Sequence, residues 1–210
     1  MSPPEPISLA RSESRVLRLL NLDLFVLFNL ALFLLMCAFS YYARFVEYRG
    51  AANALEFLVY ALVIILGSVF LWVYFRKYPF DSKLLGLIQV GILLHYGGAF
   101  VEIGGARLYD HLLLGLRYDK LVHFANAGII AALIGRLFRI RAMRRDLIDA
   151  VLIVVAVLGL GAIIEVVEYL VCLTIPGHGV GGYDNNMQDL IANLAGGVTS
   201  VLIQYGRVRD

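Results

Sequence analysis

Long hydrophobic runs separated by short polar segments make up most of the chain. Each run approaches the roughly 20 residues that a helix needs to cross a hydrocarbon core of about 30 Å. The pattern predicts an all-α, polytopic membrane helix bundle with about six transmembrane helices. We expect the spans at 19–39, 54–75, 84–103, 121–138, 147–175 and 187–205. Residues 19–205 then form a single transmembrane domain between cytoplasmic segments 1–18 and 206–210.

The composition supports this interpretation and excludes the classes of soluble protein. Of 210 residues, 60% are hydrophobic and 16% are charged, whereas soluble domains carry about 25% charged residues. The mean hydropathy is +0.80. The two cysteines, Cys37 and Cys172, both lie inside apolar runs, which excludes a disulfide framework or a cysteine-rich zinc site. The first run is too long for a signal peptide and no A-x-A cleavage site follows it, so we expect an uncleaved anchor.

Basic residues are distributed unevenly between the two sides of the predicted membrane domain. Of 18 lysines and arginines, 13 fall in the N-terminus, the segments 76–83 and 136–146, and the C-terminus. By the positive-inside rule, both termini are cytoplasmic and the 176–184 loop is outside. Nine acidic residues fall in the outer half, so the outer side is acidic. We expect a prokaryotic cytoplasmic (inner) membrane protein whose polar site faces the extracytoplasmic side.

The fourth predicted span begins with a polar stripe. At 100° per residue, Asp119, His123 and Asn126 fall within about 60° of one another on a helix. A plainer interpretation makes Asp119 a cap of the helix start, with Lys120 reaching the lipid headgroups. His123 lies one turn deeper, where an ionisable side chain indicates function.

The fifth predicted span carries two acids three residues apart, Glu165 and Glu168. They project from one helix face, where an unpaired carboxylate would cost several kcal/mol. They therefore need a cation, a proton or a hydrogen-bond donor. The alternative is a pair of structural hydrogen bonds to other helices, with one carboxyl protonated.

Two further spans contribute polar residues. The sixth places Asp189 and Asn193 on one face, although Asp189 can equally cap the helix start. The third carries His95 and Glu102, seven residues apart and so nearly in register, although His95 can equally be an interhelical hydrogen-bonding residue.

The expected topology brings these stripes together. Spans three and five run toward the outside and carry their polar residues near their C-terminal ends. Spans four and six run toward the inside and carry their polar residues near their N-terminal ends. All four sets therefore meet in the outer half of the membrane. The glycine-rich 176–184 loop is either a lid over this site or a flexible connector.

The order of these motifs resembles a known family. Tyr118-Asp119-Lys120-Leu121-Val122-His123-Phe124, the Glu165-x-x-Glu168 pair and the 188–196 segment QDLIANLAG are similar to the VanZ-like superfamily, and most of all to its YjdF-like inner-membrane branch. The resemblance covers residues 84–205 and implies a polytopic membrane protein. Its shared polar positions correspond to Asp119, Lys120, His123, Glu165, Glu168, Asp189 and Asn193. VanZ itself is associated with teicoplanin resistance, but this chain departs from that branch by its extra N-terminal spans and its glycine-rich loop.

Two function classes fit the converging stripes. The first is an enzyme acting on a lipid or lipid-linked envelope intermediate, with a divalent metal (Zn, Mn, Fe or Mg) held by His123, Glu165, Glu168 and Asp189. In it, His123 and Glu168 are catalytic and Asp119 orients His123 or acts as a base. The second is a non-catalytic lipid or cation binder, or a proton-coupled transporter. We expect membrane lipids as partners and no nucleic acid. The remaining candidate binding residues are Lys120, Asn126, Asn193, His95 and Glu102.

Overall fold

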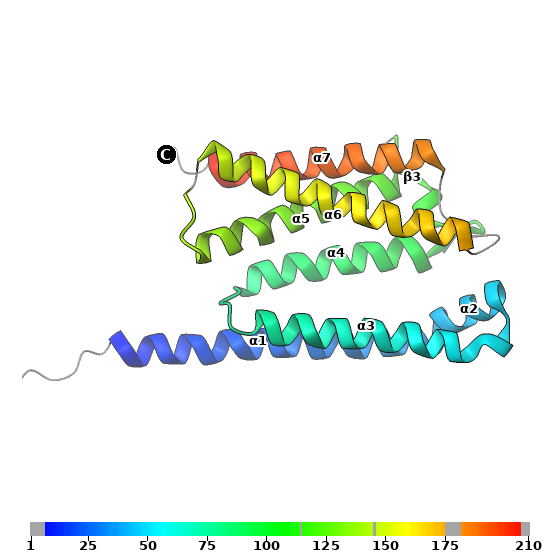
Figure 1. Ribbon diagram of the computed structural model, residues 1–210, viewed down its shortest axis with the longest axis horizontal. Coiled ribbons are helices and arrows are strands. Elements are labelled where there is room, and N and C mark those ends of the chain that lie inside the picture. Colours follow the sequence, from blue (N-terminus) through cyan, green and yellow to red (C-terminus); the bar gives the residue numbers. More distant parts are fainter. Residues whose placement is uncertain (1–6, 114, 145, 175–181, 207–210) are drawn as a thin grey trace, which may run out of the picture. The chain divides into compact units, whose positions relative to one another are not determined.

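The computed structural model describes residues 7–113, 115–144, 146–174 and 182–206. Helices account for nearly all of these residues, which confirms the all-α fold class (Figure 1). Contacts group the chain into two compact units, Met1–Leu85 and Gly86–Asp210. Each unit is described by itself.

The first unit is a helical hairpin. Helix α1 (Ile7–Met36) continues through a π-helical turn (Cys37–Tyr41) into α2 (Tyr42–Arg49). After Gly50, whose φ of +82° reverses the chain, a 3₁₀ turn (Ala51–Asn53) leads into α3 (Ala54–Phe75), which packs on α1. Such a φ is readily adopted only by glycine.

Polar contacts tie this hairpin at both ends. Near one end, the Trp72 indole N–H donates to Asp23 at 2.8 Å and the Arg76 guanidinium donates to the same carboxylate at 3.1 Å. Near the other end, Arg49 pairs with Glu56 at 3.1 Å. The apolar middles of α1 and α3 thus lie between two ion pairs.

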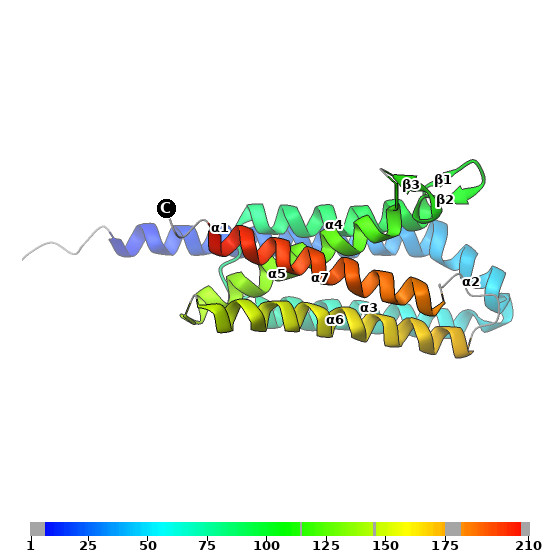
Figure 2. The ribbon, with the colours of Figure 1, turned by 90° about the horizontal axis from the view of Figure 1, so that it is seen from above.

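The second unit holds the remaining helices. It comprises all but the first turn of α4 (Ser82–Phe100), then α5 (Tyr118–Ile140), α6 (Leu147–Thr174) and α7 (Tyr183–Gly206). Helices α5, α6 and α7 pack together as a bundle (Figures 1 and 2). Their core contains small and branched side chains: Ala127, Ala131, Ala150, Ile153, Val157 and Val201.

Glycines bring α5 and α7 into backbone contact. A methyl group at Gly196 would overlap the carbonyl oxygen of Phe124, and one at Gly128 would lie 3.4 Å from the carbonyl oxygen of Gly196. Small residues at such crossings are the usual means of helix association in membranes. The close approach brings the polar residues near the start of α5 within reach of those near the start of α7.

The segment between α4 and α5 differs from the prediction. Helix α4 ends at Phe100 rather than at residue 103, and two short antiparallel hairpins follow. They are β1 (Glu102–Ile103) with β2 (Ala106–Arg107), and β3 (Leu112–Leu113) with β4 (Leu116–Arg117), separated by a 3₁₀ turn, η3 (Leu108–Asp110). The reason is local: Gly104 and Gly105 adopt φ of +59° and +83°, as a two-residue hairpin turn requires.

Five described helical segments are long and apolar enough to span a membrane: Asn21–Arg49, Ala51–Phe75, Ser82–Phe100, Tyr118–Ile140 and Leu147–Leu170. The sixth expected span corresponds to α7, which has 24 residues but is more polar. Its polar side chains Asp189 and Asn193 are buried within the second unit, at 1% and 6% exposure. Low hydropathy in α7 therefore reflects polar groups that are buried in protein rather than exposed to lipid.

Candidate functional site

A buried lysine lies at the centre of the polar cluster. The Lys120 ammonium donates to Asp189 Oδ1 at 2.6 Å and to Asp119 Oδ2 at 2.9 Å. It also lies 2.9 Å from the side-chain oxygen of Asn185 and 3.2 Å from the backbone oxygen of that residue. The expectation that Lys120 extends to the headgroups is therefore wrong: its side chain is only 8% exposed. The reason is that α7 brings two acceptor residues close to the first turn of α5.

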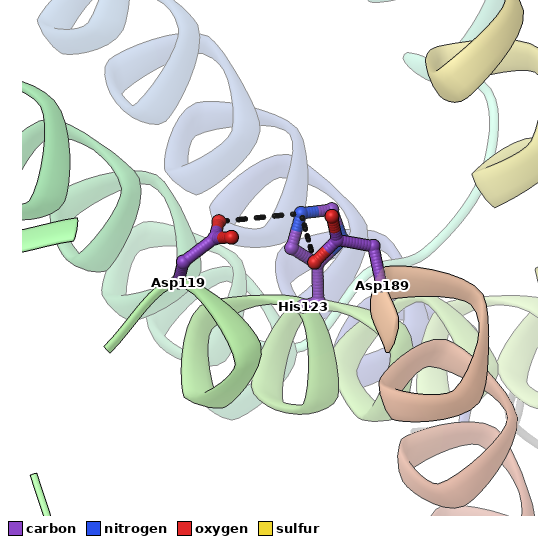
Figure 3. A group of neighbouring side chains, drawn as sticks. All are labelled: Asp119, His123 and Asp189. Atoms are coloured by element: carbon purple, nitrogen blue, oxygen red, sulfur yellow. Dashed lines mark ion pairs between the residues drawn. The ribbon is translucent and has the colours of Figure 1, made fainter. Parts of the chain in front are cut away.

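His123 completes a group with metal-ligand chemistry. Its Nε2 atom lies 3.4 Å from Asp189 Oδ1 and 3.6 Å from Asp119 Oδ1 (Figure 3). One ligand atom from each of these three residues lies within 4.8 Å of the others. Two carboxylates and an imidazole form a donor set suited to zinc and to other divalent transition metals.

The local sequence explains how the group is held. Asp119 and His123 are four residues apart on α5, so they lie one above the other on a single face. On α7 the same spacing lets the Asn185 amide donate to Asp189 Oδ2 at 2.7 Å. Both oxygens of Asp189 are therefore occupied by donors, which fixes the orientation of this nearly inaccessible carboxylate.

A cavity of about 170 Å³ adjoins the cluster. Its wall combines polar and apolar side chains from α4, η3, α5, α6 and α7. The lining residues are His95, Tyr109, Asp119, Val122, His123, Asn126, Ala127, Ile130, Val157, Gly161, Ile164, Glu168 and Asn193. The volume accommodates a few water molecules or part of a headgroup. Asp119 and His123 are thus accessible from the cavity, whereas the buried Asp189 is not part of its lining.

The two glutamates of α6 occupy different places. Glu168 lines the cavity. Glu165 is 6% exposed, and neither of its carboxylate oxygens has a hydrogen-bond partner among the described residues. Its electrostatic neighbours are Glu168, Asp189, Lys120 and Asp119. The structure brings both glutamates near the cluster, but the described group with ligand atoms within 4.8 Å comprises Asp119, His123 and Asp189.

Helix α4 contributes His95 but not Glu102. The Tyr109 hydroxyl lies 2.5 Å from His95 Nδ1, and both residues line the cavity. Glu102 is exposed in β1, outside the cavity lining. The prediction that His95 and Glu102 share a helix face is therefore wrong, because α4 ends between them. Sequence reasoning missed Tyr109, whose only signal is an aromatic side chain in a short segment between glycine turns.

Asn126 and Asn193 also line the cavity, as the stripes predicted. Each lies against a glycine: a methyl group at Gly91 would overlap the Asn126 amide, and one at Gly161 would crowd the Asn193 amide. Most of the 176–184 loop lies outside the described residues, so its role as a lid stays a prediction.

A family comparison decides the broad class of the protein. The model of the family "Predicted membrane protein (DUF2238)" matches residues 25–210. The chain belongs to this membrane protein family. No curated protein and no solved structure matches it. Together with the apolar helices, membership establishes a multi-pass membrane protein. The resemblance to the VanZ-like superfamily and its YjdF-like branch stays a prediction.

Proposed function

We propose that the protein is a metal-assisted membrane enzyme that hydrolyses a lipid or a lipid-linked envelope intermediate. The observation that carries the proposal is the Asp119, His123 and Asp189 group, whose ligand atoms lie within 4.8 Å of one another and of which Asp119 and His123 line a cavity. Three protein ligands beside a cavity leave coordination positions for water and substrate, as catalytic rather than structural metal sites do.

Charge balance supports a divalent cation at this place. Asp119, Asp189, Glu165 and Glu168 act on one another electrostatically, and the basic side chains Lys120 and His123 act on them as well. With all four acids and Lys120 ionised and His123 neutral, the group carries a net charge of −3. A divalent cation reduces this to −1, which lowers the cost of holding carboxylates at low dielectric.

Each residue then has a role that its position allows. Asp119, His123 and Asp189 would hold the metal, which when bound would supply Lewis-acid chemistry and make a water molecule more acidic. Glu168, on the cavity wall, accepts a proton from that water. The water oxygen bonds to the carbonyl carbon or phosphorus, the bond to the leaving oxygen breaks, and the leaving oxygen takes up the proton from Glu168. Lys120 holds the two aspartates in place.

The surroundings of the cavity favour a substrate that arrives from the bilayer. The wall includes residues from three of the apolar helices, α4, α5 and α6. The distribution of basic residues predicts that the site lies in the extracytoplasmic half of a prokaryotic inner membrane.

Metal analysis of the purified protein tests the first half of the proposal. After incubation with Zn, Mn and Mg and removal of free metal, we expect about one divalent ion per chain in the wild type. His123→Ala and Asp189→Asn should lose it. Two matched variants, His111→Ala and Asp110→Asn, should retain it, because both residues lie in the segment between α4 and α5 and outside the metal-capable group. Metal-free wild type would refute the metal centre.

Activity toward membrane lipids tests the second half. Metal-loaded protein is incubated with total bacterial lipid extract, and hydrolysis products are identified by mass spectrometry. Glu168→Gln should keep its metal and lose about 10²–10⁴-fold in rate, the usual contribution of a general base. Glu102→Gln, a change at an exposed glutamate, is the matched control. Equal rates for both variants would refute the role of Glu168.

One observation favours a second candidate, a non-catalytic cation or headgroup binder or a proton-coupled transporter. Lys120 already lies within 2.9 Å of both aspartates. A single ammonium can therefore replace the metal as their countercharge. Wild type that binds no metal but depends on Asp119 and Glu168 for binding or uptake of a cationic solute would support this candidate.

A further inference from the structure

His95 and Tyr109 form a preorganised pair on the cavity wall. The Tyr109 hydroxyl lies 2.5 Å from His95 Nδ1, and the two rings meet edge to face with centroids 5.8 Å apart. Both side chains line the same cavity as Asp119, His123 and Glu168. The proposed metal centre and the proposed base leave this pair without a role.

Tyr109 is held firmly enough to orient the histidine. A methyl group at Gly98 would overlap the Tyr109 ring, so α4 and this ring are in direct contact. The ring also packs against Tyr118 at a centroid distance of 6.3 Å. Tyr118 in turn donates from its hydroxyl to the Leu94 carbonyl at 3.2 Å, one residue before His95. Two aromatic side chains therefore connect η3 and the start of α5 to the turn of α4 that carries His95.

The Tyr109 contact favours one tautomer of His95. A phenol is a good donor and an unprotonated imidazole nitrogen is a good acceptor, which favours a hydroxyl that donates to Nδ1 and a neutral ring with its hydrogen on Nε2. The carboxylates of Asp119 and Glu168 line the same cavity. Their negative potential favours an N–H rather than a lone pair at Nε2, the ring nitrogen that Tyr109 does not contact.

We propose that His95 is the hydrogen-bond donor that receives an oxygen of the substrate, and that Tyr109 is the residue that positions it. The ligand chemistry is an ester carbonyl oxygen or a phosphodiester oxygen. This proposal rests on the proposed function for its substrate class. Because the ring is neutral, it transfers no proton; its N–H orients the oxygen and stabilises the negative charge that develops there.

The tautomer is tested by spectroscopy, without any activity measurement. Full-length protein with ¹⁵N-labelled histidine is placed in phosphatidylcholine nanodiscs and treated with chelator. The signal of His95, one of four histidines, is assigned by its loss in His95→Gln. We expect an unprotonated, hydrogen-bonded Nδ1 and a protonated Nε2. Tyr109→Phe should convert this signal to a mixture of tautomers, whereas Tyr96→Phe, which removes a hydroxyl from the neighbouring ring, should leave it unchanged. A protonated Nδ1, or no change in Tyr109→Phe, overturns the proposal.

Binding of two defined probes tests the ligand. Dihexanoyl phosphatidylglycerol offers both carbonyl and phosphodiester oxygens, and its ether-linked analogue offers only the latter. We expect His95→Ala to weaken binding of the ester probe about fivefold, as loss of one neutral hydrogen bond does, with part of the loss restored in His95→Gln. If His95→Ala weakens binding of the ether probe equally, His95 binds the phosphodiester oxygen. If it weakens binding of the ester probe alone, His95 binds the carbonyl oxygen. Equal affinities of wild type and His95→Ala for both probes, absence of binding included, overturn the proposal.

The outcomes separate this inference from the proposed function. The histidine spectrum is recorded without metal, so a metal-free wild type with the expected tautomer and probe binding would remove the metal-assisted enzyme and keep His95 as a donor. A metal-loaded protein whose His95 carries its hydrogen on Nδ1 would keep the metal centre and remove the proposed role of His95.

Discussion

Replacing Lys120 by methionine should cause a large loss of stability. Methionine has a similar length but no charge, so the change leaves Asp119 and Asp189 without their ammonium partner. Asp189 is 1% exposed, and water cannot take the place of the lysine without rearrangement. Of the three ammonium hydrogens, two satisfy carboxylates, at 2.6 and 2.9 Å, and one is shared by the two oxygens of Asn185.

The magnitude follows from these bonds. Hydrogen bonds to charged groups contribute about 1.5–3 kcal/mol each, so two of them contribute about 3–6 kcal/mol. Breaking a buried ion pair by removing one partner costs about 3–5 kcal/mol. We therefore expect Lys120→Met to lower the free energy of unfolding by about 4 kcal/mol, close to a thousandfold in the unfolding equilibrium constant.

Titration with sodium dodecyl sulfate in mixed micelles, followed by far-ultraviolet circular dichroism, measures this loss. Fluorescence is unsuitable because the single tryptophan, Trp72, lies in the first unit. Lys83→Met, at an exposed lysine, is the matched control and should change stability by less than about 0.5 kcal/mol. Adding Asp189→Asn to Lys120→Met should recover part of the loss, because one uncompensated charge is removed. If Lys120→Met unfolded together with the Lys83→Met control, the buried ion cluster would be refuted.

Three further predictions concern packing, burial and topology. Gly196→Ala should lower the free energy of unfolding by about 1–3 kcal/mol, because its methyl group would meet the Phe124 carbonyl. Gly159→Ala is the control: nothing lies within 4 Å of the added methyl group, so it should be neutral in the same titration. Equal losses of stability in the two variants would contradict the α5–α7 contact. Glu165→Gln should be neutral or stabilising by about 1–2 kcal/mol, because it removes a buried carboxylate that has no hydrogen-bond partner among the described residues; a loss of stability like that of Lys120→Met would contradict it. In a cysteine-free background, Arg141→Cys should resist an impermeant thiol reagent added to intact cells, and labelling from outside would reverse the predicted orientation.

The helices could be predicted well from the sequence because hydrophobic run length is a direct physical requirement of the bilayer. The run 54–75 coincides with α3, and 147–175 coincides with α6 to within one residue. The hydrophobic run continues past Phe100, so the predicted end of α4 lies three residues beyond the observed one. The adjacent Gly104 and Gly105 are the signal in the sequence that indicates the hairpin.

The site was predicted in part, since helical periodicity indicates which residues share a face but not how deeply a face is buried. Asp119 and His123 could be paired by their spacing, and both lie in the metal-capable group. The partners of Lys120 could not be predicted from the sequence. A flexible lysine at the start of a helix extends either to lipid headgroups or to a neighbouring helix, and the distance to that helix decides between them. That distance depends on the contact between Gly196 and Phe124, which is tertiary.

The same backbone contact between α5 and α7 restricts which helices can shift relative to one another. Sliding α7 along α5 by one residue displaces it by about 1.5 Å, which would distort the 2.6 Å hydrogen bond between Lys120 and Asp189 and move Gly196 away from the Phe124 carbonyl that it contacts. We therefore expect α5 and α7 to move together as one rigid body, with the Asp119, Lys120 and Asp189 cluster held fixed between them. If the cavity binds a ligand as proposed, we expect α4 or α6 to shift when it enters, because their contacts with Asn126 and Asn193 are made through side chains that can rotate.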